Sequence, residues 1–192
     1  SIGCITEERR VASTDYSLKG WKTDPKEIDT EKENINKLLK DFYKNPKDPG
    51  AAWRIGMYYF GNKEYVRAEY WFRYSLKNLK DIEKYPGRVK LYYLLAEAYM
   101  WQGKKEEARK YLEMTLAVKQ PIEPYYVEFS EYKKAHFYLG KLDILDHRFK
   151  EAEEHFQKYL ALGGDPALVE QEKQKIQVSQ RKKQKKEILE KP

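Results

Sequence analysis

The sequence predicts an all-α protein, a short right-handed α-solenoid of stacked helix pairs with a further helix at each end. The first observation is a helical segment that recurs at 64–76, 104–116 and 148–160, with Ala fifth, a large apolar residue ninth and Leu thirteenth. The second is a Gly or Ala that stands twelve positions before each of these alanines, directly after a large apolar residue. The third is length, since 192 residues suit a short repeat array.

The N-terminal part predicts a tether and then a helix. Residues 1–23 are polar and are expected to form a flexible tether. A helix is expected from Asp24, which can cap it, with Pro25 in its first turn and Glu27 at the capping-box position. The apolar face of this helix holds Ile28, Ile35, Leu38, Leu39 and Phe42. The Pro- and Gly-containing segment 45–50 ends it.

Three helix pairs are predicted within 24–166, at about 50–79, 89–120 and 133–164. The small residue of the first helix and the Ala of the second let two backbones approach closely, while large neighbours fill the grooves. The turns read GNK, QGK and DHR, and Gly61 and Gly103 suit a helix C-terminus. Each pair leaves an apolar side uncovered, so the pairs are expected to stack.

These units resemble tetratricopeptide repeats, whose motif reads W-x2-L-G-x2-Y, then A-x3-F, then P. The matching residues are Ile55, Gly56, Tyr59, Ala68 and Phe72; Leu95, Ala96, Tyr99, Ala108 and Leu112; and Leu139, Gly140, Ala152 and Phe156. Pro121 and Pro166 stand near the ends of the second and third units, and the resemblance covers roughly 50–166.

The units depart from this family in two ways. Their alanines lie 40 and 44 residues apart, whereas the family repeat has 34. The extra residues predict a prolonged helix at 77–87 and an early helix start within 120–132. In addition, Asp143 stands where the motif has Tyr, which predicts looser packing of the last pair.

The C-terminal segment 167–192 predicts a capping helix that runs into a basic tail. Residues 173–186 hold seven Lys or Arg and no acid, which equals the net charge of +7. A polyanion such as a nucleic acid or an anionic membrane could bind there, and the simpler interpretation is a solvated, fraying helix. Nucleic acid is not the expected partner, because no aromatics alternate with the basic residues. The candidate polyanion site is Arg181, Lys182, Lys183, Lys185 and Lys186.

Cys4 is a candidate for lipidation. The stretch SIGC resembles the end of a bacterial lipoprotein signal, although Ser1 stands where Leu is usual. If Cys4 is lipidated, residues 1–3 belong to a removed signal, and the protein is lipid-anchored in the bacterial envelope and faces the periplasm. Otherwise Cys4 is an incidental cysteine and the protein is expected in the cytoplasm. A single cysteine excludes an intramolecular disulfide.

No catalytic or metal-binding pattern is present in the sequence. The three histidines, His136, His147 and His155, lack a matching acid, nucleophile or ligand spacing and are expected at the surface. No Gly-rich phosphate loop occurs. We therefore expect no enzyme, no cofactor, no metal and no small-molecule substrate.

The family resemblance implies a scaffold that binds another protein in a concave groove formed by the first helix of each pair. By position, the groove is expected to be lined by Trp53, Met57, Phe60, Tyr93, Glu97, Met100, Trp101, Phe137, Lys141 and Ile144. Lys90 and Lys134 stand at its edge. The Lys and Asn of the family's carboxylate clamp are absent, so an apolar or aromatic anchor is expected instead. The N-terminal segment with Trp21 is an alternative occupant of the groove.

Two functions fit this architecture. One is an adaptor, which in an envelope setting resembles assembly factors for pili, secretion channels or outer-membrane complexes. The other is a structural subunit permanently built into a larger complex of the envelope or of an appendage. An exposed groove favours the adaptor, and large apolar patches on the outer face favour the subunit.

Overall fold

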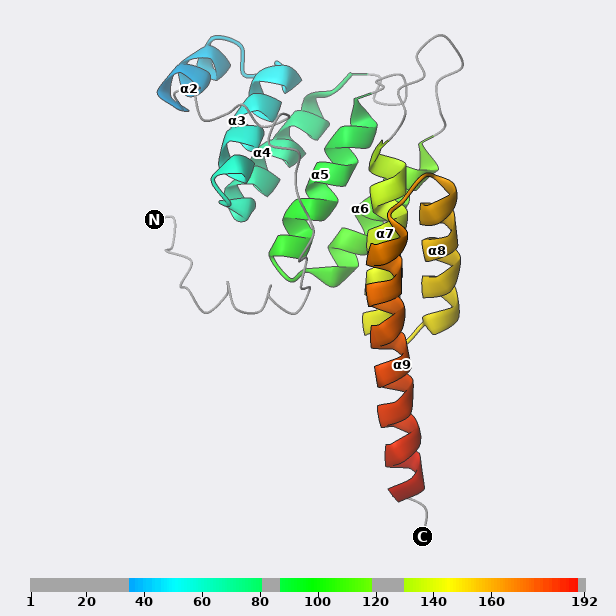
Figure 1. The fold of residues 1–192 in the computed structure, drawn as a ribbon. Coiled ribbons are helices and arrows are strands. Elements are labelled where there is room, and N and C mark those ends of the chain that lie inside the picture. Colours follow the sequence, from blue (N-terminus) through cyan, green and yellow to red (C-terminus); the bar gives the residue numbers. More distant parts are fainter. Residues whose placement is uncertain (1–34, 81–86, 119–129, 190–192) are drawn as a thin grey trace. The chain divides into compact units, whose positions relative to one another are not determined.

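The computed structural model describes residues 35–80, 87–118 and 130–189. These residues form eight helices and no strand, so the all-α prediction is confirmed (Figure 1). The helices are α2 (Ile35–Lys44), α3 (Pro49–Gly61), α4 (Tyr65–Asn78), α5 (Arg88–Trp101), α6 (Lys105–Ala117), α7 (Ser130–Leu145), α8 (Phe149–Ala161) and α9 (Pro166–Leu189). The predicted tether, Cys4 and the predicted capping residues from Asp24 to Glu27 lie outside the described residues.

The chain divides into two compact units, Ser1–Val127 with α2 to α6 and Glu128–Pro192 with α7 to α9. In the first unit, α3 pairs with α4 and α5 pairs with α6, while α4 and α5 join the two pairs. In the second unit, α7 pairs with α8, and α9 contacts both. The predicted helix pairs are therefore present, each formed by neighbouring helices.

Close approach inside the pairs explains the small residues of the motif. A Cβ atom added to Gly56 would lie 2.6 Å from Cδ1 of Phe72, and one added to Gly140 would lie 2.7 Å from Cε1 of Phe156. A glycine is therefore required opposite each phenylalanine. The second pair has Ala96 and Leu112 at the corresponding positions, and the smaller Leu side chain leaves room for the extra methyl group.

The turn inside each pair contains one residue in the left-handed conformation, at Lys63 (φ 60°), Gly103 (φ 72°) and His147 (φ 58°). The N–H groups of Lys63 and Glu64 donate to the carbonyls of Phe60 and Tyr59, at 3.0 and 2.8 Å. The same two bonds recur in the other turns and form the Schellman motif. Gly61 and Gly103 were both predicted to suit a helix C-terminus, and both lie at one. Gly103 takes the left-handed position, whereas Gly61 is the last residue of α3 and Lys63 takes the left-handed position of that turn.

The joint between the first two pairs contains a buried carboxylate. Glu69 of α4 is 9% exposed. Gln102 Nε2 and Lys104 Nζ donate to its Oε2 at 2.9 and 3.3 Å, and Arg73 Nη1 lies 3.5 Å from its Oε1. Charge-assisted bonds of this kind compensate the cost of burying the carboxylate.

The connections between the pairs follow the sequence prediction only in part. α4 ends at Asn78 because Leu79 has extended backbone, so the predicted prolongation of this helix is wrong. Residues 81–86, in the same connection, lie outside the described residues. α7 begins at Ser130, which agrees with an early start before 133.

In the second unit, Asp143 occupies the position where the motif has Tyr. The side chain of Asp143 is buried, and Arg148 Nη2 donates to its Oδ1 at 2.7 Å. An ion pair therefore takes the place of the tyrosine ring at this position. Asp165 caps α9 by accepting from the N–H of Ala167 at 2.8 Å.

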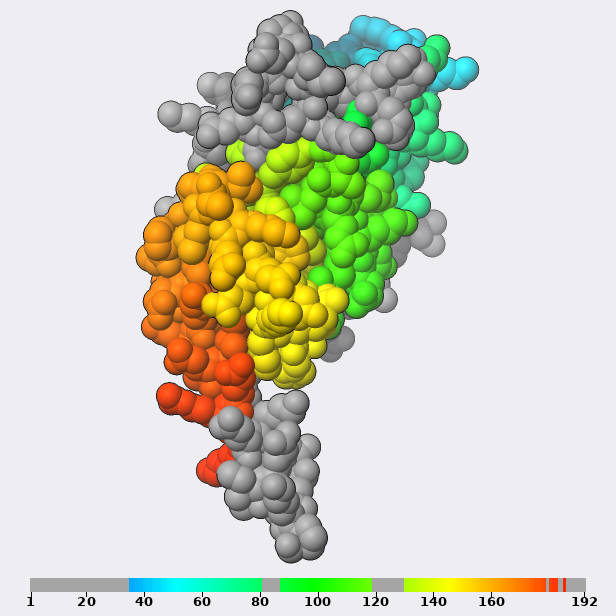
Figure 2. Space-filling view, turned by 90° about the vertical axis from the view of Figure 1, so that its right-hand side faces the viewer, coloured from blue at the N-terminus to red at the C-terminus, as the bar shows by residue number. Residues whose placement is uncertain are grey.

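Only the first part of α9 packs on its neighbours. Val169 and Glu172 are buried, whereas the C-terminal half of the helix extends beyond the ends of α7 and α8 (Figure 1). In the space-filling view, α8 and the first part of α9 form one closed surface (Figure 2). The beginning of α9 therefore caps the pair, as expected for a terminal helix.

Candidate partner-binding surfaces

In the first unit, most side chains assigned to the groove are buried. Seven of these residues lie on α3 and α5: Trp53, Met57, Phe60, Tyr93, Glu97, Met100 and Trp101. Five of them are at most 4% exposed, and only Trp53 and Trp101 are half-buried. A partner meeting the first helices of this unit would therefore touch mainly the two tryptophans.

A tyrosine that the sequence analysis did not assign to any site fills the space beside these residues. The ring of Tyr65, the first residue of α4, stacks on Trp101 with centroids 5.4 Å apart and 6° between the planes. It also meets Phe60 edge-on at 5.4 Å. Burial and the nearby carboxylate of Glu97 raise the pKa of Tyr65 to about 12. The helical pattern gave no signal for this contact, because it joins α4 to residues at the ends of two other helices.

In the second unit, the face of α7 assigned to the groove meets α9. Phe137, Lys141 and Ile144 are all buried. Lys141 Nζ lies 3.7 Å from Oε1 of Glu172 and 5.6 Å from the ring centroid of Phe137. Burial lowers the pKa of Lys141, and the Glu172 carboxylate opposes this shift. Lys141 therefore stabilises the contact with the capping helix, a role that the sequence analysis did not anticipate.

The remaining sequence candidates have a simpler environment. Lys90 and Lys134, predicted at the groove edge, are half-buried. Arg181, Lys182 and Lys185 are exposed on the extended part of α9. Lys183 and Lys186 lie on the same helix, but their side chains are outside the described part of the chain. Arg181, Lys182 and Lys185 thus lie exposed on one helix.

Two histidines form a pair that the sequence analysis missed. Nδ1 of His136 on α7 and Nδ1 of His155 on α8 lie 2.9 Å apart, and both side chains are half-buried. Burial, together with the charge of His155, lowers the pKa of His136 to about 4. Only His147 is fully at the surface, as predicted. The missed pair joins residues 19 apart, a separation that helical spacing within one helix does not reveal.

An aromatic cluster at the start of the first unit is the largest feature that the sequence analysis overlooked. We call it the α2–α4 aromatic face, and it consists of Phe42, Tyr43, Tyr70, Trp71 and Tyr74. Phe42 of α2 meets Trp71 and Tyr74 of α4, with ring centroids 4.9 and 5.3 Å apart. Tyr43 and Tyr70 are 70% and 60% exposed. A signal existed, since Tyr70 and Tyr74 lie on the side of α4 opposite to Ala68.

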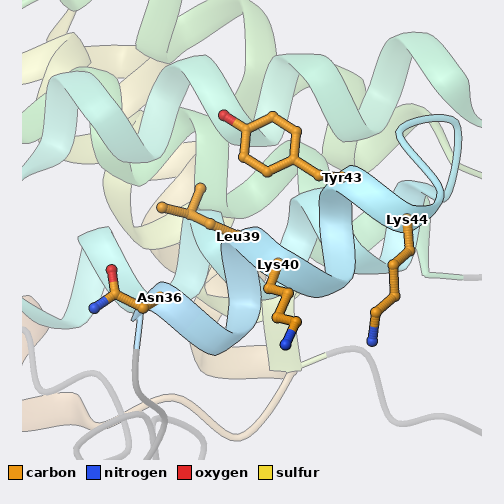
Figure 3. Close-up of a pocket in the computed structure, with 5 residues that line it drawn as sticks. All are labelled: Asn36, Leu39, Lys40, Tyr43 and Lys44. Atoms are coloured by element: carbon orange, nitrogen blue, oxygen red, sulfur yellow. The ribbon is translucent and has the colours of Figure 1, made fainter.

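A shallow depression lies along α2 beside this face. It is lined by Asn36, Leu39, Lys40, Tyr43 and Lys44. Figure 3 shows Leu39 and Tyr43 on one side of the helix and the two lysines on the other. The α2–α4 aromatic face therefore adjoins the apolar side chain of Leu39 and the positively charged side chains of Lys40 and Lys44.

Within the described residues, no group of three or more His, Cys, Asp or Glu side chains could hold a metal ion. None of the described helices is both long enough and apolar enough to pass through a membrane.

Comparison with known proteins identifies the repeat. Residues 60–128 match the family model described as tetratricopeptide repeat. No curated protein sequence matches the chain. Among solved structures, the chain is similar to "MamA RS-1 ArsTM double mutant" at 17% identity and a TM-score of 0.35, covering 83% of this chain and 97% of that one. It is also similar to "MamA 41-end from Desulfovibrio magneticus RS-1" at 18% identity and a TM-score of 0.34, with the same coverages. Likenesses at this level carry no information about the site.

Proposed function

Because residues 60–128 match the tetratricopeptide repeat model, we propose that the chain is a non-catalytic scaffold that holds a segment of a partner protein against α3 and α5, the first helices of its first two pairs. Such repeats typically act as interaction modules. The observation that supports this contact is the partial exposure of Trp53 and Trp101, among otherwise buried residues on α3 and α5. Tryptophan is the residue type most enriched at the energetic centres of protein interfaces.

Site-specific crosslinking in cells of the source organism tests this proposal. A photoreactive phenylalanine replaces Trp53 or Trp101, one at a time. We expect both positions to capture the same partner protein, because both belong to first helices of the first unit. The matched control carries the same photoreactive residue at Leu162, which is 48% exposed beyond the end of α8. Capture at Leu162 but at neither tryptophan would refute binding along the first helices.

A structural subunit of a larger complex is the second candidate function. The α2–α4 aromatic face supports it, because apolar side chains on the solvent side of α4 suit a permanent contact. The two functions differ in how fast the bound partner exchanges with free protein. An adaptor releases its crosslinkable partner when competed with excess unlabelled protein, whereas a built-in subunit stays in place over the same period. Slow or absent exchange in purified complexes would therefore favour the subunit.

The cellular setting that we propose is the bacterial envelope, in which the chain assists assembly of a larger complex. Cys4 within SIGC supports this setting. We expect cells supplied with a radioactive or alkyne-bearing fatty acid to label the natural protein, and we expect the Cys4→Ser variant to lose that label. Absence of label on the unaltered protein would refute the lipid anchor at Cys4.

A further inference from the structure

We propose that the α2–α4 aromatic face is a second docking surface, which binds an acidic segment of a partner protein that carries one aromatic or aliphatic anchor. This surface is separate from Trp53 and Trp101 of the first helices. Its test is therefore independent of the crosslinking experiment above.

The exposure of this face supports the proposal. Tyr43 and Tyr70 are 70% and 60% exposed, although large apolar side chains usually avoid such positions in groups. The cluster is nevertheless anchored, because Phe42 is only 6% exposed and contacts the rings of Tyr43 and Trp71. Rings held in this way lose little conformational entropy when a partner binds.

The positive charge of this region supports an acidic partner. Residues 35–80 contain ten lysines and arginines but only four acidic residues. Three of these acids are already engaged: Glu69 is buried, Asp41 pairs with Lys44 at 3.1 Å, and Glu64 pairs with Arg67 at 2.7 Å. The surface of this region is therefore strongly cationic, and an acidic partner complements it.

Lysines accompany the exposed aromatic side chains on both helices. Lys77 follows Tyr70 by seven residues, about two turns along the same side of α4. On α2, Lys40 and Lys44 lie on the side of the helix opposite to Leu39 and Tyr43 (Figure 3), so they stand at the border of the face. Carboxylates next to an apolar anchor would thus meet Lys77 of α4 and, at the border, the lysines of α2.

The geometry of the rings favours a protein partner over a nucleic acid. A basic surface with aromatic side chains also attracts single-stranded nucleic acid. Bases bind such surfaces by stacking on open ring faces. Here Phe42 and Tyr70 both meet Trp71 edge-to-face, at 86° and 89° between the planes. These perpendicular rings offer no parallel stack into which a base could insert, and the pair Leu39 and Tyr43 suits an apolar side chain better than a stacked base (Figure 3).

The experiment measures binding of short fluorescent peptides to the full chain by anisotropy. One peptide has the sequence Glu-Asp-Glu-Trp-Glu-Asp-Glu, and the second replaces its tryptophan by alanine. We expect the tryptophan peptide to bind at least ~10-fold more tightly, equivalent to about 1.4 kcal/mol. Its affinity should fall as salt is raised, because charges contribute. An oligothymidine of similar length serves as the nucleic-acid arm and is expected to bind more weakly than the tryptophan peptide.

Variants locate the binding site. The double variant Tyr43→Ala with Tyr70→Ala should weaken binding of the tryptophan peptide ~10-fold or more. Leu162→Ala, at an apolar position elsewhere that is 48% exposed, should leave it unchanged. Lys40→Glu with Lys77→Glu should weaken it further than the same two charge reversals at Lys182 and Lys185. Because all of these side chains are exposed, the substitutions should not unfold the protein, and weaker binding then reports a change in the binding surface. Circular dichroism of each variant checks that the helical content is unchanged.

Several outcomes would overturn the proposal. These are undetectable binding at millimolar peptide, equal binding of the two peptides, tighter binding of oligothymidine, or equal weakening by the control variants. Sedimentation of the unliganded protein examines the remaining occupant, a second copy of the chain. A dimer that is abolished by Tyr43→Ala with Tyr70→Ala would assign the face to self-association and would also refute the proposal.

Discussion

Replacing Gly56 with alanine should test the packing rule that relates the small residue of each first helix to the large residue of each second helix. The added Cβ would lie 2.6 Å from Cδ1 and from Cε1 of Phe72, roughly 1 Å closer than ordinary contact. Phe72 is completely buried, and its ring lies 6.1 Å from that of Phe60, so it has little room to move. Overpacking of this kind costs about 1–3 kcal/mol.

Helix propensity acts in the opposite direction. Alanine stabilises a helix interior by about 1 kcal/mol relative to glycine. Because the added Cβ meets two ring atoms of Phe72 at 2.6 Å, the overpacking cost lies in the upper part of that range, about 2–3 kcal/mol. We therefore expect Gly56→Ala to lower the free energy of unfolding by a net ~1–2 kcal/mol. A neutral or stabilising effect would show that the backbones separate without cost and that the packing rule is wrong.

The double variant Gly56→Ala with Phe72→Leu provides the sharper result, because it reproduces the Ala96 and Leu112 combination of the second pair. Phe72→Leu alone should cost about 1–2 kcal/mol through lost burial. Together the two changes should be less harmful than their sum by about 1–2 kcal/mol, since the leucine leaves room for the new methyl group.

Urea unfolding followed by far-ultraviolet circular dichroism measures all four proteins of this cycle. The matched control combines Gly56→Ala with Phe156→Leu. Phe156 packs on Gly140 and not on Gly56, so this pair of changes should be additive. Equal coupling in both cycles, or none in either, would refute the reasoning.

Four further predictions follow from single contacts. Lys63→Gly should stabilise the protein by roughly 0.5–1 kcal/mol because it relieves a left-handed residue, whereas Gly103→Ala should destabilise it by about 1 kcal/mol; thermal melting checks both signs. Glu69→Ala should cost about 2 kcal/mol in urea unfolding, since its partners lose their buried acceptor, and an unchanged midpoint would contradict this. The pKa of His136 is lowered from 6.5 to about 4 in the folded protein. The contribution of His136 to stability is therefore present above pH 6.5 and is lost as the pH falls toward 4. The His136→Asn variant should show a melting temperature that depends less on pH between these two values. Truncation after Gln180 should leave the melting temperature nearly unchanged, because the buried residues of α9 are Val169 and Glu172, and a loss of several degrees would show that the tail packs on the body.

The sequence by itself determined the helix pairs. The spacings from Gly56 to Tyr59 and from Ala68 to Phe72 each lie within one helix, where the period of 3.6 residues puts both members on the same face, and the short turn between the helices brings the two faces together. The same reasoning correctly placed Gly103 at a helix C-terminus and a further helix after the third pair. It also led to the tetratricopeptide repeat, because that motif consists of these same local spacings.

Only the tertiary structure decided which side chains remain accessible. Tyr93 and Met100 have the spacing of groove residues, yet they are 4% and 1% exposed. Burial depends on neighbours that are distant in the sequence, such as Tyr65 against Trp101 or Glu172 beside Lys141. The helical period specifies the direction in which a side chain points from the axis of its helix, but it does not specify which other helix packs against that side.

The same limit explains the polar contacts and the α2–α4 aromatic face. Asp143 looked like a defect in the motif until Arg148 was found to bind it, and the His136–His155 pair joins two helices. Tyr43 and Tyr70 each resemble an ordinary surface residue in the sequence. They become part of one surface because α2 packs at the end of the first unit, where Phe42 meets the rings of α4.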